Sequence, residues 1–134
     1  MIKLKRAYDV VSRTDGTRFL VERLWPRGLS KPTLQLEAWL KEVGPSTALR
    51  KWFGHDPEKW REFRHRYFRE LDSRREAWEP IVSAARRGTV TLVYSSHDTA
   101  HNNAVALKEY VQAKSRRPAK SNRAAAAPRR RSAR

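Results

Sequence analysis

A six-residue run at positions 89–94, Thr-Val-Thr-Leu-Val-Tyr, constrains the fold of this chain more than any other segment. It is apolar, rich in β-branched residues and free of charge, which is typical of a central strand covered on both faces. A polar loop follows, and then a segment from about position 100 to 113 that is predicted to be a helix. This strand–loop–helix unit is predicted to form the centre of an α/β domain.

Two further strands are predicted near the start of the chain. Positions 2–8 alternate apolar and basic residues, as a half-buried strand does, and positions 18–24 follow a turn at Asp15-Gly16. Strands that alternate with helices favour a parallel arrangement. The predicted fold is therefore α/β, a small layered domain with a largely parallel sheet flanked by helices.

Four more helices are predicted between the early strands and the run at 89–94. An apolar stripe at helical spacing covers positions 36–43 and ends at Gly44-Pro45. Ser46 is a predicted cap for a helix that ends at Gly54, and Asp56-Pro57 is a strong helix start. A fourth helix is predicted from about position 77 to 88, which places Pro80 in its first turn, where proline is tolerated.

Charge divides the chain into a domain at residues 1–113 and a basic tail at residues 114–134. The net charge is +16, and the tail alone holds nine Lys and Arg residues with no acid. Its only apolar residues besides proline are alanines, and Pro118 and Pro128 interrupt helix formation. The sequence predicts a disordered tail whose charge attracts nucleic acid or another polyanion.

Several classes of protein are excluded or disfavoured by composition. The chain has no cysteine, so disulfides, thiolate catalysis and cysteine-ligated zinc are impossible. No segment approaches the roughly 20 apolar residues of a membrane span. We therefore expect a cytoplasmic protein with no membrane association, and the sequence implies no cofactor.

The loop after the run at 89–94 is the first candidate site. α/β sheets place ligands beyond the carboxyl ends of their strands, where helix N-termini offer free N–H groups. Asp98, His101 and Asn102 lie at this point and are suited to holding an anion. The alternative is that Ser95, Asp98 and Thr99 simply cap the following helix.

A second candidate lies after the strand at 18–24. If the two strands are parallel, Arg23 and Arg27 reach the same edge of the sheet as the first loop, with Trp25 and Gly28 supporting them. A guanidinium group matches phosphate or carboxylate oxygens in geometry. The alternative is an ordinary surface loop with Trp25 in the core.

His55 is a third candidate, because it lies beside the Asp56-Pro57 helix start and could be an oriented base. The alternative is a loop histidine satisfied by its neighbours. His55, His97, Asp98 and His101 could in principle hold a metal, but no HxH or HExxH spacing is present, so no metal site is predicted.

The segment Arg-Leu-Trp-Pro-Arg-Gly-Leu-Ser-Lys at 23–31 makes the chain resemble a known family. Together with Trp-Phe-Gly-His-Asp-Pro at 52–57 and the His101-Asn102 pair, it is similar to the YeaO-like bacterial family of small α/β proteins, whose activity is not assigned. The resemblance covers residues 1–113, and the basic tail lies outside it. It implies hallmark positions at Arg23, Trp25, Arg27, Gly28, Arg50, Trp52, Gly54, His55, Asp98, His101 and Asn102. His97 departs from the family pattern, which puts a role for it in doubt.

Three functional hypotheses follow. The leading one is a domain that binds a phosphate or carboxylate group of a nucleotide or nucleic acid through Arg23, Arg27, Arg50 and the loop from Asp98 to Asn102. The second is a cysteine-independent hydrolase or transferase acting on a phosphorylated small molecule, with His101 or His55 as a base oriented by Asp98. The third is a partner-docking module, which applies if these residues lie far apart.

Overall fold

The computed structural model describes the backbone of residues 1–121 and the side chains of residues 1–116. Its strands are β1 (Ile2–Arg6), β2 (Thr17–Leu20), β3 (Ala38–Trp39) and β4 (Val90–Tyr94). Its α-helices are α1 (Lys31–Leu34), α2 (Thr47–Phe53), α3 (Trp60–Asp72), α4 (Arg75–Arg87) and α5 (Asn103–Ser121). Short 3-10 helices lie at η1 (Arg13–Asp15), η2 (Lys41–Val43) and η3 (Pro57–Lys59).

The four strands form one sheet in the order β1-β4-β2-β3, and every pairing is parallel. All five residues of β4 are buried, which confirms the prediction of a central strand. The two early strands are not neighbours, because β4 lies between them and pairs with both. The predicted α/β fold with a largely parallel sheet is confirmed.

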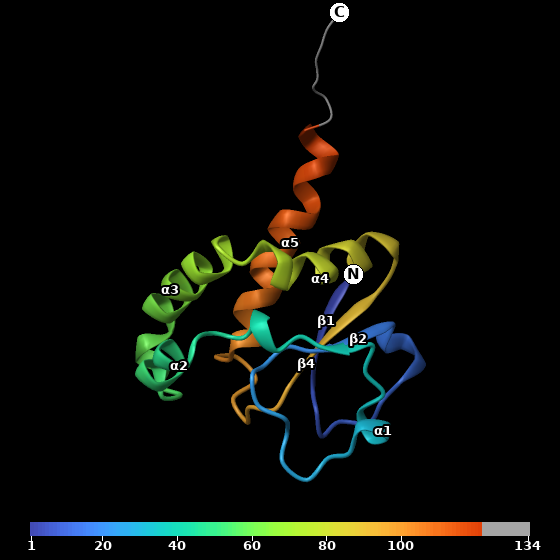
Figure 1. The fold of residues 1–134 in the computed structure, drawn as a ribbon, viewed down its shortest axis with the longest axis horizontal. Coiled ribbons are helices and arrows are strands. Elements are labelled where there is room, and N and C mark those ends of the chain that lie inside the picture. The colour runs from blue at the N-terminus through green and yellow to red at the C-terminus, as the bar shows by residue number, and fades with distance from the viewer. Residues whose placement is uncertain (122–134) are drawn as a thin grey trace, which may run out of the picture.

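The two faces of the sheet are covered differently (Figure 1). On one face, β4 residues such as Leu92 pack with the apolar sides of α3, α4 and α5 in a large core. On the other face, Leu20 and Val93 pack with Leu34 of α1 and with the segment that leads into it. Burial of one such side chain contributes about 1.5–3 kcal/mol, so the helical face holds most of the apolar stabilisation.

The predicted helix at 36–43 is wrong. Ala38–Trp39 form strand β3 at the edge of the sheet, and Lys41–Val43 form the 3-10 helix η2. The N–H of Leu40 donates to the Leu20 carbonyl at 2.8 Å, and Trp39 Nε1 donates to the Glu22 carbonyl at 2.7 Å. Pairing with the edge of β2 therefore overrides a stripe that has helical spacing.

Other boundaries differ by a few residues. β1 ends at Arg6 and β2 at Leu20, earlier than predicted. α4 begins at Arg75, so Pro80 is its sixth residue and lies beyond the first turn. Pro80 is exposed. Because proline has no N–H, Pro80 cannot donate to the carbonyl four residues earlier.

Two predicted helix boundaries agree with the structure. The Ser46 hydroxyl accepts from the N–H of Leu49 and caps α2, which ends at Gly54 in the left-handed conformation. Asp56 accepts from the N–H of Glu58 and begins the turn that leads into α3. Both are local signals, and both were readable from a few adjacent residues.

α5 runs to Ser121, beyond the predicted end at position 113. The Nζ of Lys114 lies 5.7 Å from the ring centroid of Trp78 and 5.2 Å from that of Tyr110, so Lys114 packs on the domain. The rest of the predicted tail, residues 122–134, lies outside the described residues. Among the helices up to Ser121, none is long and apolar enough to cross a membrane.

Candidate anion-binding pocket

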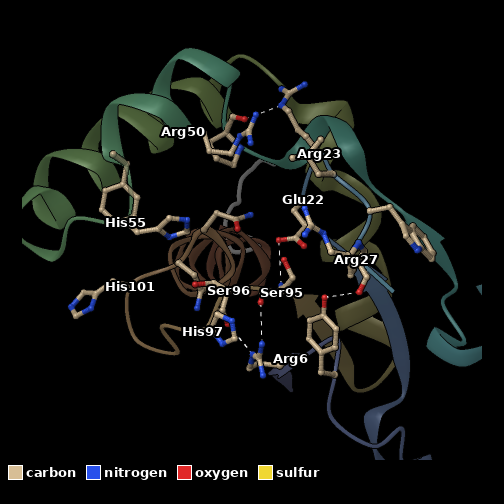
Figure 2. A pocket seen from close by; sticks show the side chains of 18 of the residues that line it. Arg6, Glu22, Arg23, Arg27, Arg50, His55, Ser95, Ser96, His97 and His101 are labelled. Atoms are coloured by element: carbon tan, nitrogen blue, oxygen red, sulfur yellow. Dashed lines mark hydrogen bonds between the residues drawn. The ribbon is translucent and has the colours of Figure 1, made fainter. Parts of the chain in front are cut away.

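A cavity of about 580 Å³ lies beyond the carboxyl ends of β1, β2 and β4 (Figure 2). Because these strands are parallel, the residues that follow them meet at one edge of the sheet. β1 contributes Arg6, and the loop after β4 contributes Ser95, Ser96 and His97. The segment after β2, the helix α2 and the start of α5 complete the walls: Glu22, Arg23, Trp25, Arg27, Arg50, His101, Asn102 and Asn103.

The predicted residues largely come together here. Arg23, Arg27, Arg50, His55, His101 and Asn102 all line this cavity, as does Trp25. Asp98 does not line it and instead lies behind His101. The condition for the partner-docking hypothesis, that these residues lie far apart, is not met.

The walls of the cavity are strongly cationic. They carry Arg6, Arg23, Arg27, Arg50 and three histidines, against one carboxylate, that of Glu22. A concave site lined by one sign of charge raises the local concentration of ligands of the opposite sign. The pocket is therefore electrostatically suited to an anion.

Two of the four arginines are held by backbone carbonyl groups. Arg6 donates from Nε to the Ser96 carbonyl at 2.9 Å and from a terminal nitrogen to the Ser95 carbonyl at 3.2 Å. Arg23 donates from Nε to the Pro45 carbonyl at 2.8 Å and lies 3.5 Å from the carboxylate of Glu42. These contacts fix the loop after β4 and the entry to α2, so Arg6 and Arg23 build the walls while still contributing charge.

Arg27 and Arg50, unlike Arg6 and Arg23, are not held by backbone carbonyl groups of the described residues. Both side chains are exposed, and neither guanidinium group makes a hydrogen bond or ion pair with another side chain or carbonyl in the described part of the chain. Figure 2 shows them entering the site from separate elements, Arg50 from α2 and Arg27 from the segment after β2. The Tyr8 hydroxyl donates to the Arg27 carbonyl at 2.9 Å and so restrains the backbone at that position. The donors of both guanidinium groups are available to a ligand.

Glu22 was not predicted as a site residue. The N–H of Ser95 donates to its Oε1 at 3.3 Å. Burial raises the pKa of the Glu22 carboxyl, and the contacts with Ser95 and the charge of Arg50 only partly offset this. The sequence pattern placed Glu22 inside a longer strand. The signal that marks it is an acidic residue just beyond the end of a parallel strand.

The loop after β4 is held by Asp98. Its Oδ1 accepts from the N–H groups of Ala100 and His101, each at 2.9 Å, and its Oδ2 lies 3.1 Å from Nδ1 of His101. The backbone hydrogen bonds from Ala100 and His101 lower the pKa of the Asp98 carboxyl. Asp98 therefore fixes the loop and the orientation of the His101 ring.

Asn102 caps α5. Its Oδ1 accepts from the N–H of Val105 at 3.0 Å, and its Nδ2 donates to the Asp98 carbonyl at 2.8 Å. Its side chain is buried, and both polar atoms are engaged. A cap is present, as the alternative for this loop expected, but it is Asn102 and not Ser95, Asp98 or Thr99.

The three histidines lie at the margin of the cavity. The His101 ring packs edge-on against Trp60, with centroids 5.4 Å apart. His55 is exposed and has a positive φ of 59°, directly after Gly54 at 54°. His97 also lines the cavity and is exposed.

The supporting residues separate into two groups. Trp25 lines the cavity and donates from Nε1 to the Leu29 carbonyl at 2.6 Å. Trp52, Gly54 and Gly28 do not line it. The Trp52 ring lies beneath Arg66 at 4.2 Å, away from the cavity walls. Among the side chains that the structure describes, those of residues 1–116, no group of three or more His, Cys, Asp or Glu residues is placed to hold a metal.

Comparisons with known proteins show the family. The chain is 39% identical over 111 residues to the uncharacterized protein YeaO of Escherichia coli strain K12, covering 83% of this chain and 96% of that protein. It is 34% identical over 108 residues to the uncharacterized proteins Mb3100c of Mycobacterium bovis and Rv3073c of Mycobacterium tuberculosis H37Rv, covering 81% of this chain and 91% of each. No solved structure matches. Residues 1–129 match the family described as the inactive DUF488-N3 subclade, and the chain belongs to this family of YeaO-like proteins.

Proposed function

We propose that this domain binds a phosphorylated small molecule of nucleotide size, with Arg27 and Arg50 as the residues that contact its anionic group. The observation that carries the proposal is one concave cavity lined by four arginines and three histidines against a single carboxylate. Arg27 and Arg50 hold donors that no described residue uses. A guanidinium group donates two parallel hydrogen bonds to phosphate or carboxylate oxygens, which favours these ligands over halides.

The size and lining of the cavity support a ligand larger than inorganic phosphate. Sites for small organic molecules have volumes of about 300–1,000 Å³, and this cavity has about 580 Å³. Trp25, which is partly exposed, and Tyr8, which is exposed, contribute aromatic surface to its walls. Such surface favours a ligand that has a flat apolar part in addition to its anionic group.

Binding of adenosine 5′-monophosphate, measured by isothermal titration calorimetry, tests the proposal. Arg27→Gln and Arg50→Gln should each weaken binding by about 10-fold or more, since a hydrogen bond to a charged group contributes about 1.5–3 kcal/mol. Arg13→Gln is the matched control, because Arg13 is exposed and lies before the amino end of β2, whereas the pocket lies beyond the carboxyl ends of the strands. Equal affinities for all four proteins, or no binding by the unmodified protein, would overturn the proposal.

The catalytic alternative has one observation in its favour, the 3.1 Å contact between Asp98 Oδ2 and His101 Nδ1. A carboxylate that orients an imidazole is the arrangement of a general base, and His101 would then hydrolyse or transfer a group on the same phosphorylated ligand. The description of the family as inactive supports binding over turnover. Release of phosphate from the nucleotide by the unmodified protein, and its loss in His101→Gln, would establish the catalytic function instead.

The basic tail supplies the second part of the proposal, an association with nucleic acid that does not depend on sequence. Nine basic residues without an acid lie at 114–134. Lysine and arginine residues that neutralise phosphates release counterions, which gives affinity for any duplex. This association is proposed as separate from ligand binding in the pocket, because the pocket lies at the start of α5, whereas residues 114–121 form its last part and residues 122–134 follow in the chain.

A further inference from the structure

Glu22 is an acidic side chain in a pocket that is otherwise suited to anions. It lies two residues beyond the end of β2, and its carboxylate is partly buried. Figure 2 shows it beside Ser95. Both of its hydrogen-bonding contacts come from Ser95, whose N–H donates to Oε1 at 3.3 Å and whose side chain also interacts with the carboxylate. Within the described chain, Glu22 makes no ion pair with the arginines around the cavity.

This arrangement leaves acceptor capacity unused. An ionised carboxylate has about four lone-pair sites, and Ser95 cannot fill all of them. Burying a charge whose hydrogen bonds are incomplete is costly, as is placing it near the anionic group of a ligand. The raised pKa of Glu22 reflects the first of these costs. A ligand that donates hydrogen bonds to Glu22 would compensate for both.

The place of Glu22 in the sheet indicates what kind of donor fits. In dinucleotide-binding α/β folds with an open parallel sheet, an acidic residue accepts hydrogen bonds from ribose hydroxyl groups, while the phosphate lies elsewhere beyond the carboxyl ends of the strands. Arg27 and Arg50, whose donors are free, line the same cavity as Glu22 (Figure 2), so one ligand can contact the arginines through its anionic group and Glu22 through hydroxyl groups. The rim holds the exposed side chains of Tyr8 (45%) and Leu24 (62%), which offer apolar surface to a base.

We infer that Glu22 determines specificity by accepting hydrogen bonds from vicinal hydroxyl groups, and that the ligand class is a ribose phosphate such as a ribonucleoside 5′-monophosphate. The inference rests on the proposed function, since it requires a phosphorylated ligand in this pocket. It adds that the ligand carries hydroxyl donors besides its anion. It also assigns a role to the one carboxylate that an anion site alone leaves unexplained.

The test compares two ligands on two proteins by calorimetry with the full chain. Adenosine 5′-monophosphate and its 2′,3′-dideoxy analogue differ only in the two hydroxyl groups. The unmodified protein should prefer the ribose form by about 10-fold, the value of one or two hydrogen bonds to a charged group. Glu22→Gln, which keeps the side-chain shape and an oxygen for Ser95, should reduce this preference to within about threefold.

Three results would overturn the inference. The first is equal binding of both ligands by the unmodified protein. The second is an unchanged preference for the ribose form in Glu22→Gln, and the third is tighter binding of both ligands by the same factor in Glu22→Gln, which would make Glu22 only a repelling charge. O-phosphoserine, whose donor is an ammonium group, serves as a third ligand. Glu22-dependent binding of O-phosphoserine without a ribose preference would replace the ribose with an amine.

Failure of the inference is distinguishable from failure of the proposed function. If both nucleotides bind equally and Arg50→Gln still weakens their binding, the role of Glu22 is contradicted but the anion site is supported. Absence of binding by all of these ligands contradicts both the role of Glu22 and the proposed anion site. Circular dichroism and thermal melting of Glu22→Gln confirm that the variant is folded before its affinities are compared.

Discussion

Glu22 and Ser95 are 73 residues apart in the chain, and the N–H of Ser95 donates to Oε1 of Glu22 at 3.3 Å. The contact joins the segment after β2 to the loop after β4, and so links two walls of the pocket. Parallel pairing of β2 with β4 brings these two positions to the same edge of the sheet. The geometry of the site therefore depends on a tertiary contact rather than on a local motif.

The first prediction concerns the pH dependence of stability. Burial raises the pKa of Glu22 in the folded state, so the folded protein binds a proton at Glu22 more readily than the unfolded chain does. Ionised Glu22 therefore destabilises the fold above this pKa, and the penalty disappears as the pH falls through it towards the ordinary value of 4.5. The difference in unfolding free energy between Glu22→Gln and the unmodified protein should shrink as the pH falls. Urea denaturation of both proteins at pH 8, 6.5 and 5 measures it.

Acidic groups other than Glu22, such as Asp15 and Asp98, titrate in both proteins and cancel from this difference. A difference that stays constant, or that grows as the pH falls, would contradict the burial of an ionised Glu22.

The second prediction concerns Tyr67, which is fully buried in α3 and donates from its hydroxyl to the Val43 carbonyl at 2.6 Å. Tyr67→Phe leaves that buried carbonyl without its donor and should lower the free energy of unfolding by about 1–2 kcal/mol. Tyr8→Phe is the control, because the Tyr8 hydroxyl bonds to the Arg27 carbonyl at an exposed position. The control should change stability by less than about 0.5 kcal/mol in the same urea titration. Equal effects would show that the buried bond adds nothing.

The third prediction separates two glycines that share a positive φ. Gly16 has φ 67°, and a Cβ there would lie 2.2 Å from the Thr89 carbonyl oxygen, which accepts the N–H of Thr17 at 3.0 Å. Gly28 has φ 82° and open space around the same position. Gly28→Ala should cost about 1–2 kcal/mol from backbone conformation alone. Gly16→Ala should cost more than about 3 kcal/mol, because the start of β2 must also shift. Thermal melting of both variants ranks them, and similar losses would refute the steric argument.

Signals confined to a few adjacent residues were readable from the sequence. Ser46, Gly54 and Asp56 mark the ends of their elements by backbone capping, and the uncharged run at 89–94 forms the central strand β4. The meeting of Arg27 and His101 at one edge was expected because parallel strands bring their carboxyl ends together. The family resemblance, rather than any pattern of spacing, added Arg50.

Features that depend on distant partners were not readable. The apolar residues at positions 36–43 have helical spacing in the sequence, yet hydrogen-bonding groups of β2 draw Ala38 and Trp39 into β3. Arg6 and Glu22 were missed as pocket residues, since their meeting at the site depends on the position of β4 between β1 and β2. Asn102 was predicted to contact a ligand, but the start of α5 uses both of its polar atoms.

The last prediction concerns the basic tail and duplex DNA. Lys114 packs over Trp78 and Tyr110, so the informative truncation is after Ser121 and not at position 113. It removes the five arginines at 123, 129, 130, 131 and 134. The slope of log K against log salt concentration should flatten by up to about 4.5, at roughly 0.9 for each phosphate that these arginines neutralise. Fluorescence anisotropy with a labelled duplex at several salt concentrations measures the slope.

Two full-length variants serve as controls for the truncation. Replacing the five arginines with lysine keeps the charge and should preserve the slope, whereas replacing them with glutamine should flatten it as the truncation does. Because the pocket lies at the opposite end of α5, neither change should alter the affinity for adenosine 5′-monophosphate. If the truncation leaves the slope unchanged, residues 122–134 do not contribute to nucleic-acid binding. Any affinity for DNA would then belong to the rest of the chain, whose residues 1–113 carry 21 basic against 14 acidic side chains.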